Sequence, residues 1–171
     1  MVVAWTILTI IVVLFGLVVF RGAPYVPSRS RYIRQALTEL YPVSKADSLV
    51  DIGSGDGVVL RVAAKLGAKA IGFEINPVLL AISWALSYCD KKVSVKFADI
   101  WLSHLPSTTT VVYIFSTSSN MSKLKKWLQK EVNSMGKTVY LISYGFRLIG
   151  TQEEKNVGAY YLYKFSPLHT Y

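Results

Sequence analysis

A glycine-rich segment between a predicted strand and a predicted helix constrains the fold of this chain most. It reads Asp51-Ile-Gly-Ser-Gly-Asp-Gly57, follows the apolar run Ser48 to Ile52 and opens the helical pattern of residues 57–66. Glycines at such a junction allow a tight turn from strand to helix and let a ligand lie against bare backbone. The junction is typical of α/β domains that bind nucleotide-like ligands at the carboxyl ends of their strands.

The rest of the chain alternates between strand patterns and helix patterns. After Ser48 to Ile52, the predicted strands cover residues 68–75, 93–97, 110–115, 138–144 and 160–165, and the predicted helices cover residues 29–41, 57–66, 77–88 and 121–132. Strands that alternate with helices indicate a parallel sheet with helices on both faces. We therefore predict an α/β fold with a Rossmann-like, doubly wound and mostly parallel sheet.

The spacing of the glycines distinguishes two classes of cofactor. The dinucleotide fingerprint G-x-G-x-x-G would place glycines at 53, 55 and 58, but position 58 is Val58. The third glycine is instead Gly57, which gives G-x-G-x-G after the acidic Asp51. This is the form of the loop that binds S-adenosylmethionine, in which an acidic strand end faces the methionine ammonium group.

Two further acidic residues support this cofactor. Glu74 ends the second predicted strand, where a carboxylate can accept hydrogen bonds from both ribose hydroxyls. Asp99 follows the third strand, where a carboxylate can accept from the adenine amino group. Ile75 and Ile100 would supply apolar contacts to the adenine ring. The expected cofactor-binding residues are Asp51, Gly53, Ser54, Gly55, Gly57, Glu74, Ile75, Asn76, Asp99 and Ile100.

The first twenty residues form a separate segment. Residues 2–20 are almost entirely apolar, and no charge occurs before Arg21. Nineteen helical residues extend roughly 28 Å, close to the ~30 Å of a bilayer core. The alternatives are a buried core helix and a cleavable signal peptide, but the apolar stretch of a signal peptide is shorter and follows a basic start. We therefore predict one transmembrane helix ahead of the α/β domain.

The charged residues indicate how the domain faces the membrane. All 19 Lys and Arg and all 10 Asp and Glu follow residue 20, and the net charge is +9. Arg21, Arg29, Arg31 and Arg34 directly follow the apolar run. Such residues stay on the cytoplasmic side, or the matrix side in an organelle, and attract anionic lipid headgroups. A nucleic-acid partner is the rival explanation, but no RNA-binding signature appears, so we expect no nucleic acid.

These observations divide the chain into three parts. Residues 1–20 are the predicted transmembrane anchor, residues 21–46 are a juxtamembrane segment with an N-terminal helix, and residues 47–171 are the cofactor-binding domain. Cys89 is the single cysteine, which excludes an internal disulfide. Because His104 and His169 are far apart in the sequence and not near Cys89, we expect no metal site.

With these residues identified, the chain resembles the small membrane-anchored class I protein-lysine methyltransferases. Their known substrates are the mitochondrial adenine nucleotide translocase and the ATP synthase c-subunit, and the family has short prokaryotic members. The resemblance lies in the apolar span and in four segments: residues 24–28, 51–57, 72–77 and 99–101. It implies that Tyr25, Val26 and Pro27 help to close the cofactor pocket near the reacting methyl group.

The resemblance also implies the activity. We expect an S-adenosylmethionine-dependent methyltransferase that modifies a lysine of a membrane protein near the bilayer surface. Methylation of a lipid or quinone-like small molecule is the alternative activity, and a non-catalytic membrane adaptor that retains the fold is the alternative without catalysis. The catalytic residues are not apparent, but Tyr25, Tyr113 and Tyr144 are candidates for the methyl-transfer site because aromatic faces attract a cationic amine.

Overall fold

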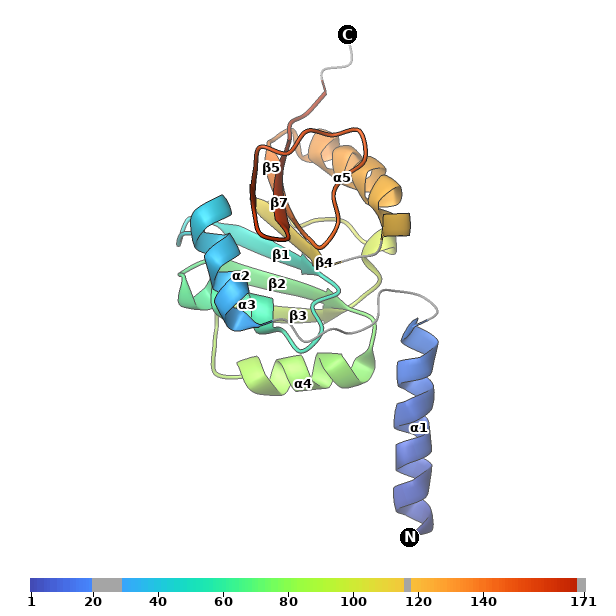
Figure 1. Ribbon diagram of the computed structural model, residues 1–171. Helices are drawn as coiled ribbons and strands as arrows, with labels where there is room; N and C mark the ends of the chain where they lie inside the picture. The colour runs from blue at the N-terminus through green and yellow to red at the C-terminus, as the bar shows by residue number, and fades with distance from the viewer. Residues whose placement is uncertain (20–28, 116–117, 169–171) are drawn as a thin grey trace.

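The domain is built on one mixed sheet of seven strands (Figure 1). The computed structural model describes residues 1–19, 29–115 and 118–168. The strands are β1 Ser48–Ile52, β2 Lys69–Glu74, β3 Val93–Phe97, β4 Val111–Phe115, β5 Val139–Tyr144, β6 Lys155–Val157 and β7 Tyr160–Phe165, in the order β3-β2-β1-β4-β5-β7-β6. The predicted Rossmann-like, mostly parallel sheet is confirmed.

The strand order places the predicted ligand site. Strands β1 to β5 are parallel, whereas β7 runs antiparallel to both β5 and β6. From β1 the chain first builds outward through β2 and β3, and then returns to β4 on the other side of β1. The crevice at the carboxyl ends of β1 and β4 is the position where doubly wound sheets bind their ligands.

Helices cover the two faces of the sheet unequally. Helices α2 Ser30–Gln35, α3 Val58–Lys65 and α4 Pro77–Ser87 lie on one side, and α5 Met121–Met135 lies on the other (Figure 1). Two hydrophobic clusters follow from this division. One joins α2 and α3 to the side chains of Leu49 and Val111, and the second joins α5 to those of Val50 and Val112. The alternation along β1 and β4 thus fills both faces.

The helix before β1 differs from the continuous helix predicted for residues 29–41. It starts as α2 and continues as one π-helical turn, Ala36–Leu40, whose apolar side chains are buried. Its N-cap residue is Arg29, which makes no side-chain capping bond. A hydrophobic pattern does not distinguish α from π turns over so few residues.

Helix α1 covers Val2–Val19 and carries no charged residue. Within residues 1–19, 29–115 and 118–168, no helix combines the length and apolarity of a membrane-crossing segment. The transmembrane anchor over residues 1–20 therefore stays a prediction.

Candidate active site

The glycine loop turns sharply between β1 and α3. Gly53, Gly55 and Gly57 all have positive φ angles, of 73°, 55° and 79°. Side chains with a Cβ rarely adopt this left-handed backbone, so each position favours glycine. The amides of Gly53 and Ser54 donate hydrogen bonds to the Phe73 carbonyl at 2.9 and 3.1 Å. The loop is thereby fixed to the end of β2.

Close packing beneath the loop adds a second requirement for glycine. A Cβ at Gly57 would collide with the hydroxyl of Ser83 on α4. A Cβ at Gly72 in β2 would lie 2.7 Å from the Cβ of Ser54 and from a methyl group of Leu60. The loop therefore packs tightly against α3, α4 and β2. Gly72 was not among the expected site residues, because a glycine inside a strand gives no direct indication of what lies above it.

Glu74 connects the loop to the start of α4. Its side chain is buried, and Oε2 accepts a hydrogen bond from the Gly55 amide at 2.7 Å. Its Oε1 accepts from the Asn76 amide, also at 2.7 Å. Each carboxylate oxygen can accept more than one hydrogen bond. Glu74 thus fixes the loop and can also accept from a ligand diol.

Asp51 is a buried carboxyl at the centre of the site. It lies in β1 directly beside Tyr113 of β4, and its side chain is almost fully buried. Burial raises the pKa of Asp51 well above its ordinary value, and the nearby carboxylates of Glu74 and Asp56 raise it further. A carboxylate in this position is stabilised by a cation. The site therefore favours a ligand with a positive charge next to Asp51.

The remaining expected residues lie at the ends of β2 and β3. The Asp99 carboxylate accepts a hydrogen bond from the Trp101 amide at 2.9 Å and so caps a short 3-10 turn, Ile100–Leu102. The side chain of Asn76 caps α4 by accepting from the amides of Val78 and Leu79. Ile100 is buried and Ile75 is half-buried. The fold thus brings the expected acids to one edge, while their contacts with the cofactor stay predictions.

Of the three tyrosine candidates, two lie close together. Tyr113 and Tyr144 both contact Tyr160 of β7, with ring centroids 6.3 and 4.5 Å apart. Tyr25 lies outside the described residues. Burial raises the pKa of Tyr113 well above its ordinary value, and that of Tyr160 to about 12. Both phenols are therefore protonated at neutral pH and can serve as hydrogen-bond donors or aromatic surfaces.

Tyr160 was not among the sequence candidates. It joins the group because β7 pairs antiparallel with β5, which sets Tyr160 opposite Tyr144. The sequence predicted a strand for residues 160–165 but gave neither its direction nor its neighbour. The pairing of two strands separated by a loop is what brings this ring to the site.

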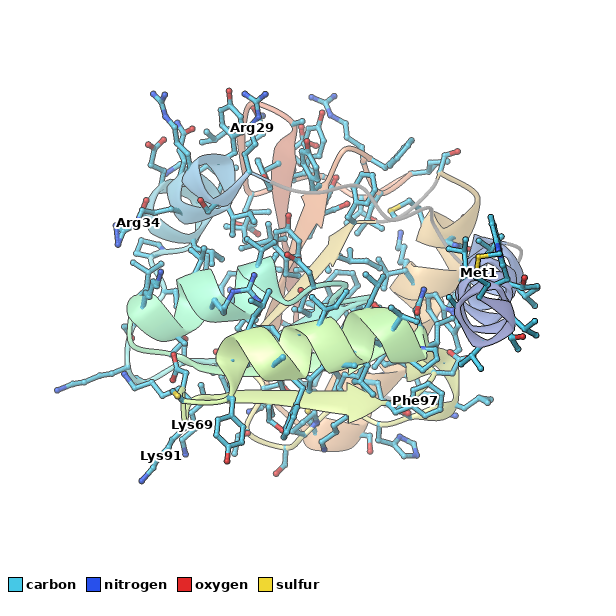
Figure 2. The ribbon with its side chains drawn as sticks, turned by 90° about the horizontal axis from the view of Figure 1, so that it is seen from below. Met1, Arg29, Arg34, Lys69, Lys91 and Phe97 are labelled. Atoms are coloured by element: carbon cyan, nitrogen blue, oxygen red, sulfur yellow. The ribbon has the colours of Figure 1, made fainter. Side chains whose placement is uncertain are left out.

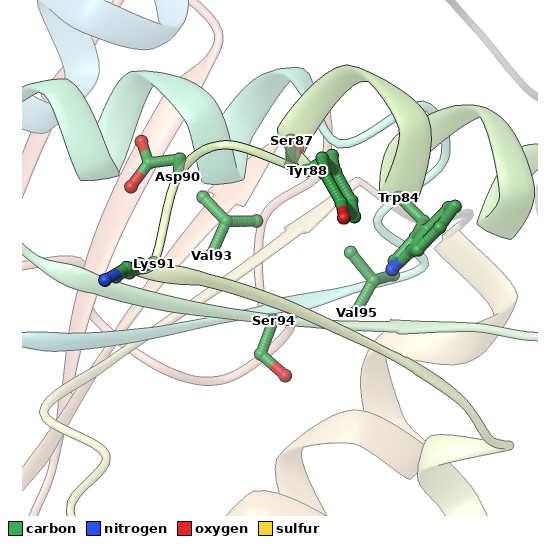
Figure 3. Close-up of a pocket in the computed structure, with 8 residues that line it drawn as sticks. All are labelled: Trp84, Ser87, Tyr88, Asp90, Lys91, Val93, Ser94 and Val95. Atoms are coloured by element: carbon green, nitrogen blue, oxygen red, sulfur yellow. The ribbon is translucent and has the colours of Figure 1, made fainter.

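One pocket lies apart from the expected cofactor site. The pocket drawn in Figure 3 lies between the end of α4 and the edge strand β3, with Trp84, Tyr88 and Val95 in its wall. It contains none of the expected cofactor residues. No group of three or more His, Cys, Asp or Glu residues is placed to hold a metal ion among residues 1–19, 29–115 and 118–168.

The arrangement fits S-adenosylmethionine in its charges and its shape. The buried Asp51 suits the methionine ammonium, Glu74 can accept from a ribose diol, and Asp99 lies one strand further along. The bare backbone of the glycine loop allows the ligand a close approach. The three carboxylates thus lie at the ends of the adjacent strands β1, β2 and β3. Their order matches the order of the ammonium group, the ribose and the adenine along an extended cofactor.

Comparison with protein families gives a match over most of this region. The model of the ANTKMT methyltransferase domain matches residues 51–155, which include the glycine loop, Glu74 and Asp99. The human lysine N-methyltransferase of the ATP synthase c-subunit is 34% identical over 119 residues, which are 68% of this chain and 50% of that protein. The chain thus spans about half the length of the curated relatives of this kind, from human, frog and rat.

A shorter prokaryotic relative and several solved structures are also similar. A protein-lysine N-methyltransferase of Saccharolobus islandicus is 35% identical over 115 residues, which are 64% of this chain and 70% of that protein. An RNA methyltransferase of Salinibacter ruber, solved with S-adenosyl-L-homocysteine, has a TM-score of 0.74 at 25% identity and covers 85% of this chain and 96% of its own. The 23S rRNA methyltransferase ErmE, with a TM-score of 0.57 and 16% identity, covers 70% of this chain and 48% of its own and shares the fold.

Proposed function

The chain belongs to the family of the ANTKMT methyltransferase domain, and we propose that it transfers a methyl group from S-adenosylmethionine to a lysine side chain of a protein. The observation that carries the methyl-transfer part is Asp51, a buried carboxyl beside a left-handed glycine loop at the point where the strand order reverses. The lysine specificity rests on the relatives that are named as lysine methyltransferases.

Each part of the cofactor would meet a different strand end. Asp51 would hold the ammonium group, Glu74 the ribose hydroxyls and Asp99 the adenine amino group, with Ile75 and Ile100 against the ring. S-adenosylmethionine supplies a methyl group already activated on sulfur, so the protein mainly has to align the acceptor and exclude water. Asp51 and Glu74 are buried, which keeps the cofactor end of the site away from solvent.

The acceptor end would be formed by tyrosines. A lysine ammonium is attracted to aromatic faces and must lose a proton before it can attack the methyl group. Partial burial against Tyr144 and Tyr160 would lower the pKa of the lysine and favour that loss. Since burial raises the pKa of Tyr113 well above its ordinary value, its hydroxyl would orient the amine as a hydrogen-bond donor and would not remove the proton.

The membrane is the second part of the proposal. The uncharged run of residues 2–20 would anchor the chain, and Arg21, Arg29, Arg31 and Arg34 would keep the domain on the cytoplasmic or matrix side. The target lysine would then belong to a membrane protein and lie just outside the bilayer. Protease protection of the domain in sealed vesicles tests this orientation, and accessibility on the opposite face would contradict it.

Two other substrate classes have specific support. A lipid or quinone-like molecule would also explain a membrane anchor. RNA is suggested by the similarity to the Salinibacter ruber RNA methyltransferase and by the net charge of +9. We favour lysine because the relatives with 34% and 35% identity are named as lysine methyltransferases, whereas the RNA enzyme is 25% identical.

One labelling experiment separates the three classes. Membranes that contain the full chain are incubated with methyl-labelled S-adenosylmethionine, and the protein, lipid and RNA fractions are counted. We expect label in protein, released as methyllysine on acid hydrolysis. The Asp51→Asn variant should lose this label, while Glu154→Gln, an exposed charge change, should keep it. Label confined to the lipid or RNA fraction would contradict the proposal.

A further inference from the structure

Helix α4 carries its apolar side chains on the outside. Its buried residues are Leu79, Ser83 and Ser87, of which two are serines. The outward residues include Ile82, Trp84, Leu86 and Tyr88, which are 41%, 61%, 58% and 72% exposed. From Ile75 to Cys89 the sequence contains no charged residue. A surface helix of a soluble domain normally has the reverse arrangement, with its apolar stripe toward the core.

The packing of the loop explains the small inward residues. Ser83 faces Gly57 so closely that a single methyl group on the glycine would collide with its hydroxyl. A large apolar side chain at position 83 would therefore not fit against the loop, although Leu79 is buried one turn earlier on the same side. This constraint does not explain the outer side, where charged or polar residues would be free of collisions. The outer apolar side chains thus require a separate reason.

The apolar surface continues beyond the helix. Phe97 ends the edge strand β3 and is 65% exposed, and Leu102 follows it at 87%. Between α4 and β3, the pocket of Figure 3 is walled by Trp84, Tyr88 and Val95, with Lys91 and Asp90 at one side. We call the exposed apolar residues Ile82, Trp84, Leu86, Tyr88 and Phe97 the α4 face. Ile82 and Leu86 lie on one flank of the helix, and Trp84 and Tyr88 lie on the other flank.

The position of α1 indicates what covers the α4 face. Helix α1 contacts α4 and projects from the domain crosswise to it (Figure 1). In Figure 2 the molecule is seen from the side toward which α1 projects: α4 lies in front of the sheet, and α1 is seen end-on at its side with Met1 toward the viewer. Trp84, Leu86 and Tyr88 are more than half exposed although α1 contacts α4, so α1 does not cover these side chains.

We propose that the α4 face docks on the surface of a lipid bilayer that contains anionic lipids. This inference rests on the proposed membrane anchoring by residues 2–20. If α1 enters a bilayer, the α4 face is directed toward the same bilayer. Trp and Tyr are the residues that favour the interface between water and hydrocarbon. Lys91 and Lys92, in the turn between α4 and β3, would contact anionic headgroups.

Docking would fix the height of the active site above the membrane. Asn76 is the N-cap residue of α4, and its backbone amide donates a hydrogen bond to the Glu74 carboxylate. The same carboxylate also accepts a hydrogen bond from the Gly55 amide. The residues expected to bind the cofactor are thus joined to the N-terminal end of α4, the helix that would lie on the lipid. With two points of attachment, α1 and α4, the domain could not rotate freely above the bilayer. Lysines close to the headgroups would then be selected by position.

A fluorescent label can report the depth of the α4 face. Cys89 is the single cysteine, is exposed and directly follows Tyr88. The full chain, labelled there with an environment-sensitive dye, is reconstituted into vesicles of phosphatidylcholine and phosphatidylserine with nitroxide on the lipid headgroups or upper acyl chains. The control carries the dye at Ser134→Cys in a Cys89→Ser background, an exposed position on α5 across the sheet. We expect a blue shift and quenching at residue 89 and neither at residue 134.

Variants test whether the apolar side chains cause the docking. Trp84→Glu with Leu86→Glu should abolish the quenching at residue 89, while the chain still sediments with vesicles and keeps its cofactor affinity. The matched control is Ile149→Glu, which changes an apolar residue that is 76% exposed outside the α4 face and should have no effect.

The outcomes distinguish this inference from the proposed function. Sedimentation with vesicles but equal solvent exposure at residues 89 and 134 would overturn the docking alone. A blue shift without quenching by lipid nitroxide would show that protein covers the face, and would also overturn it. Failure to sediment would reject both the anchor and the docking. Quenching at residue 89 without methyl transfer to protein would leave the docking in place and reject the lysine methyltransferase activity.

Discussion

The charged form of the buried Asp51 carboxyl is unfavourable in the ligand-free protein. Burial raises its pKa in the folded chain, so the folded state binds the proton more tightly than the unfolded state does. This contribution to stability is fully present below the unfolded pKa and is lost as the pH rises through the folded pKa. At neutral pH the carboxyl therefore destabilises the ligand-free protein, and cofactor binding would relieve the repulsion from Glu74.

We accordingly predict that Asp51→Asn raises the unfolding free energy of the ligand-free chain at pH 7.5 while weakening S-adenosylmethionine binding. The gain is expected because the buried amide, unlike the carboxylate, carries no charge close to Glu74 and Asp56. Urea unfolding of both proteins at pH 7.5 and pH 5 checks it, and the difference between them should shrink at the lower pH. A variant that is less stable than wild type at pH 7.5 would show that Asp51 does not carry the destabilising charge.

Glu74 should affect both stability and binding. In the structure its carboxylate accepts two backbone hydrogen bonds, from Gly55 and Asn76. We predict that Glu74→Ala lowers the unfolding free energy by about 1–3 kcal/mol and also weakens S-adenosylmethionine binding. Calorimetry and urea unfolding measure the two effects, and unchanged values of both would remove Glu74 from the site.

For individual residues, the sequence predicted where the site residues lie in the fold better than it predicted which groups they contact. The spacing of the acids and glycines placed Asp51, Glu74 and Asp99 at strand ends, where the fold has them. That the oxygens of Glu74 and Asn76 already accept backbone amides depends on local turn geometry, which one sequence pattern does not specify. Tyr160 was missed because its position depends on an antiparallel pairing with β5.

Among the elements, α5 is fastened to the loop after β3 by a buried carboxylate. Glu131 is 4% exposed and accepts from the Leu105 amide at 2.8 Å, and its other oxygen lies 3.0 Å from the His104 ring. We predict that Glu131→Ala lowers the unfolding free energy by about 1–3 kcal/mol, with a smaller loss for Glu131→Gln, which keeps one acceptor. Because Glu131 lies across the sheet from the glycine loop, cofactor affinity should change less than in Glu74→Ala. A loss of affinity as large as that of Glu74→Ala would contradict this separation.

The elements themselves were largely predictable. Strands β1, β3 and β7 match their expected bounds, because each is a short run rich in β-branched, aromatic or other apolar residues. Helix α5 runs three residues past the predicted end at residue 132, to a left-handed Gly136 that stops it. Strand β6 was missed because its three residues, Lys155–Val157, are mostly exposed and show no apolar alternation.

In the whole molecule, the two faces of the sheet are covered by different sets of helices. On one side, α3 and α4 pack against the glycine loop, and α4 also carries the α4 face. The other side is covered by α5, the one α-helix that the structure describes there (Figure 1). The sequence predicted helices on both faces but not this division, since the side on which a helix packs depends on its connection to the sheet. Nor did it indicate that apolar side chains of α4 would face outward, because a helix that is apolar on all sides is normally buried.

The last prediction concerns the segment before the domain. We expect a chain without residues 1–20 to bind S-adenosylmethionine as tightly as the full chain, because the described residues expected to hold the cofactor lie between Asp51 and Ile100. Its methyl transfer to substrates in native membranes should nevertheless fall by about 100-fold or more, since attachment to the bilayer raises the effective concentration of membrane-bound targets. Adding back a heterologous transmembrane helix should restore transfer, which distinguishes tethering from a specific contact of residues 1–20. Calorimetry measures binding, and methyl label in membrane protein measures transfer. Full activity of the truncated chain on native membranes would show that the enzyme finds its target without the anchor.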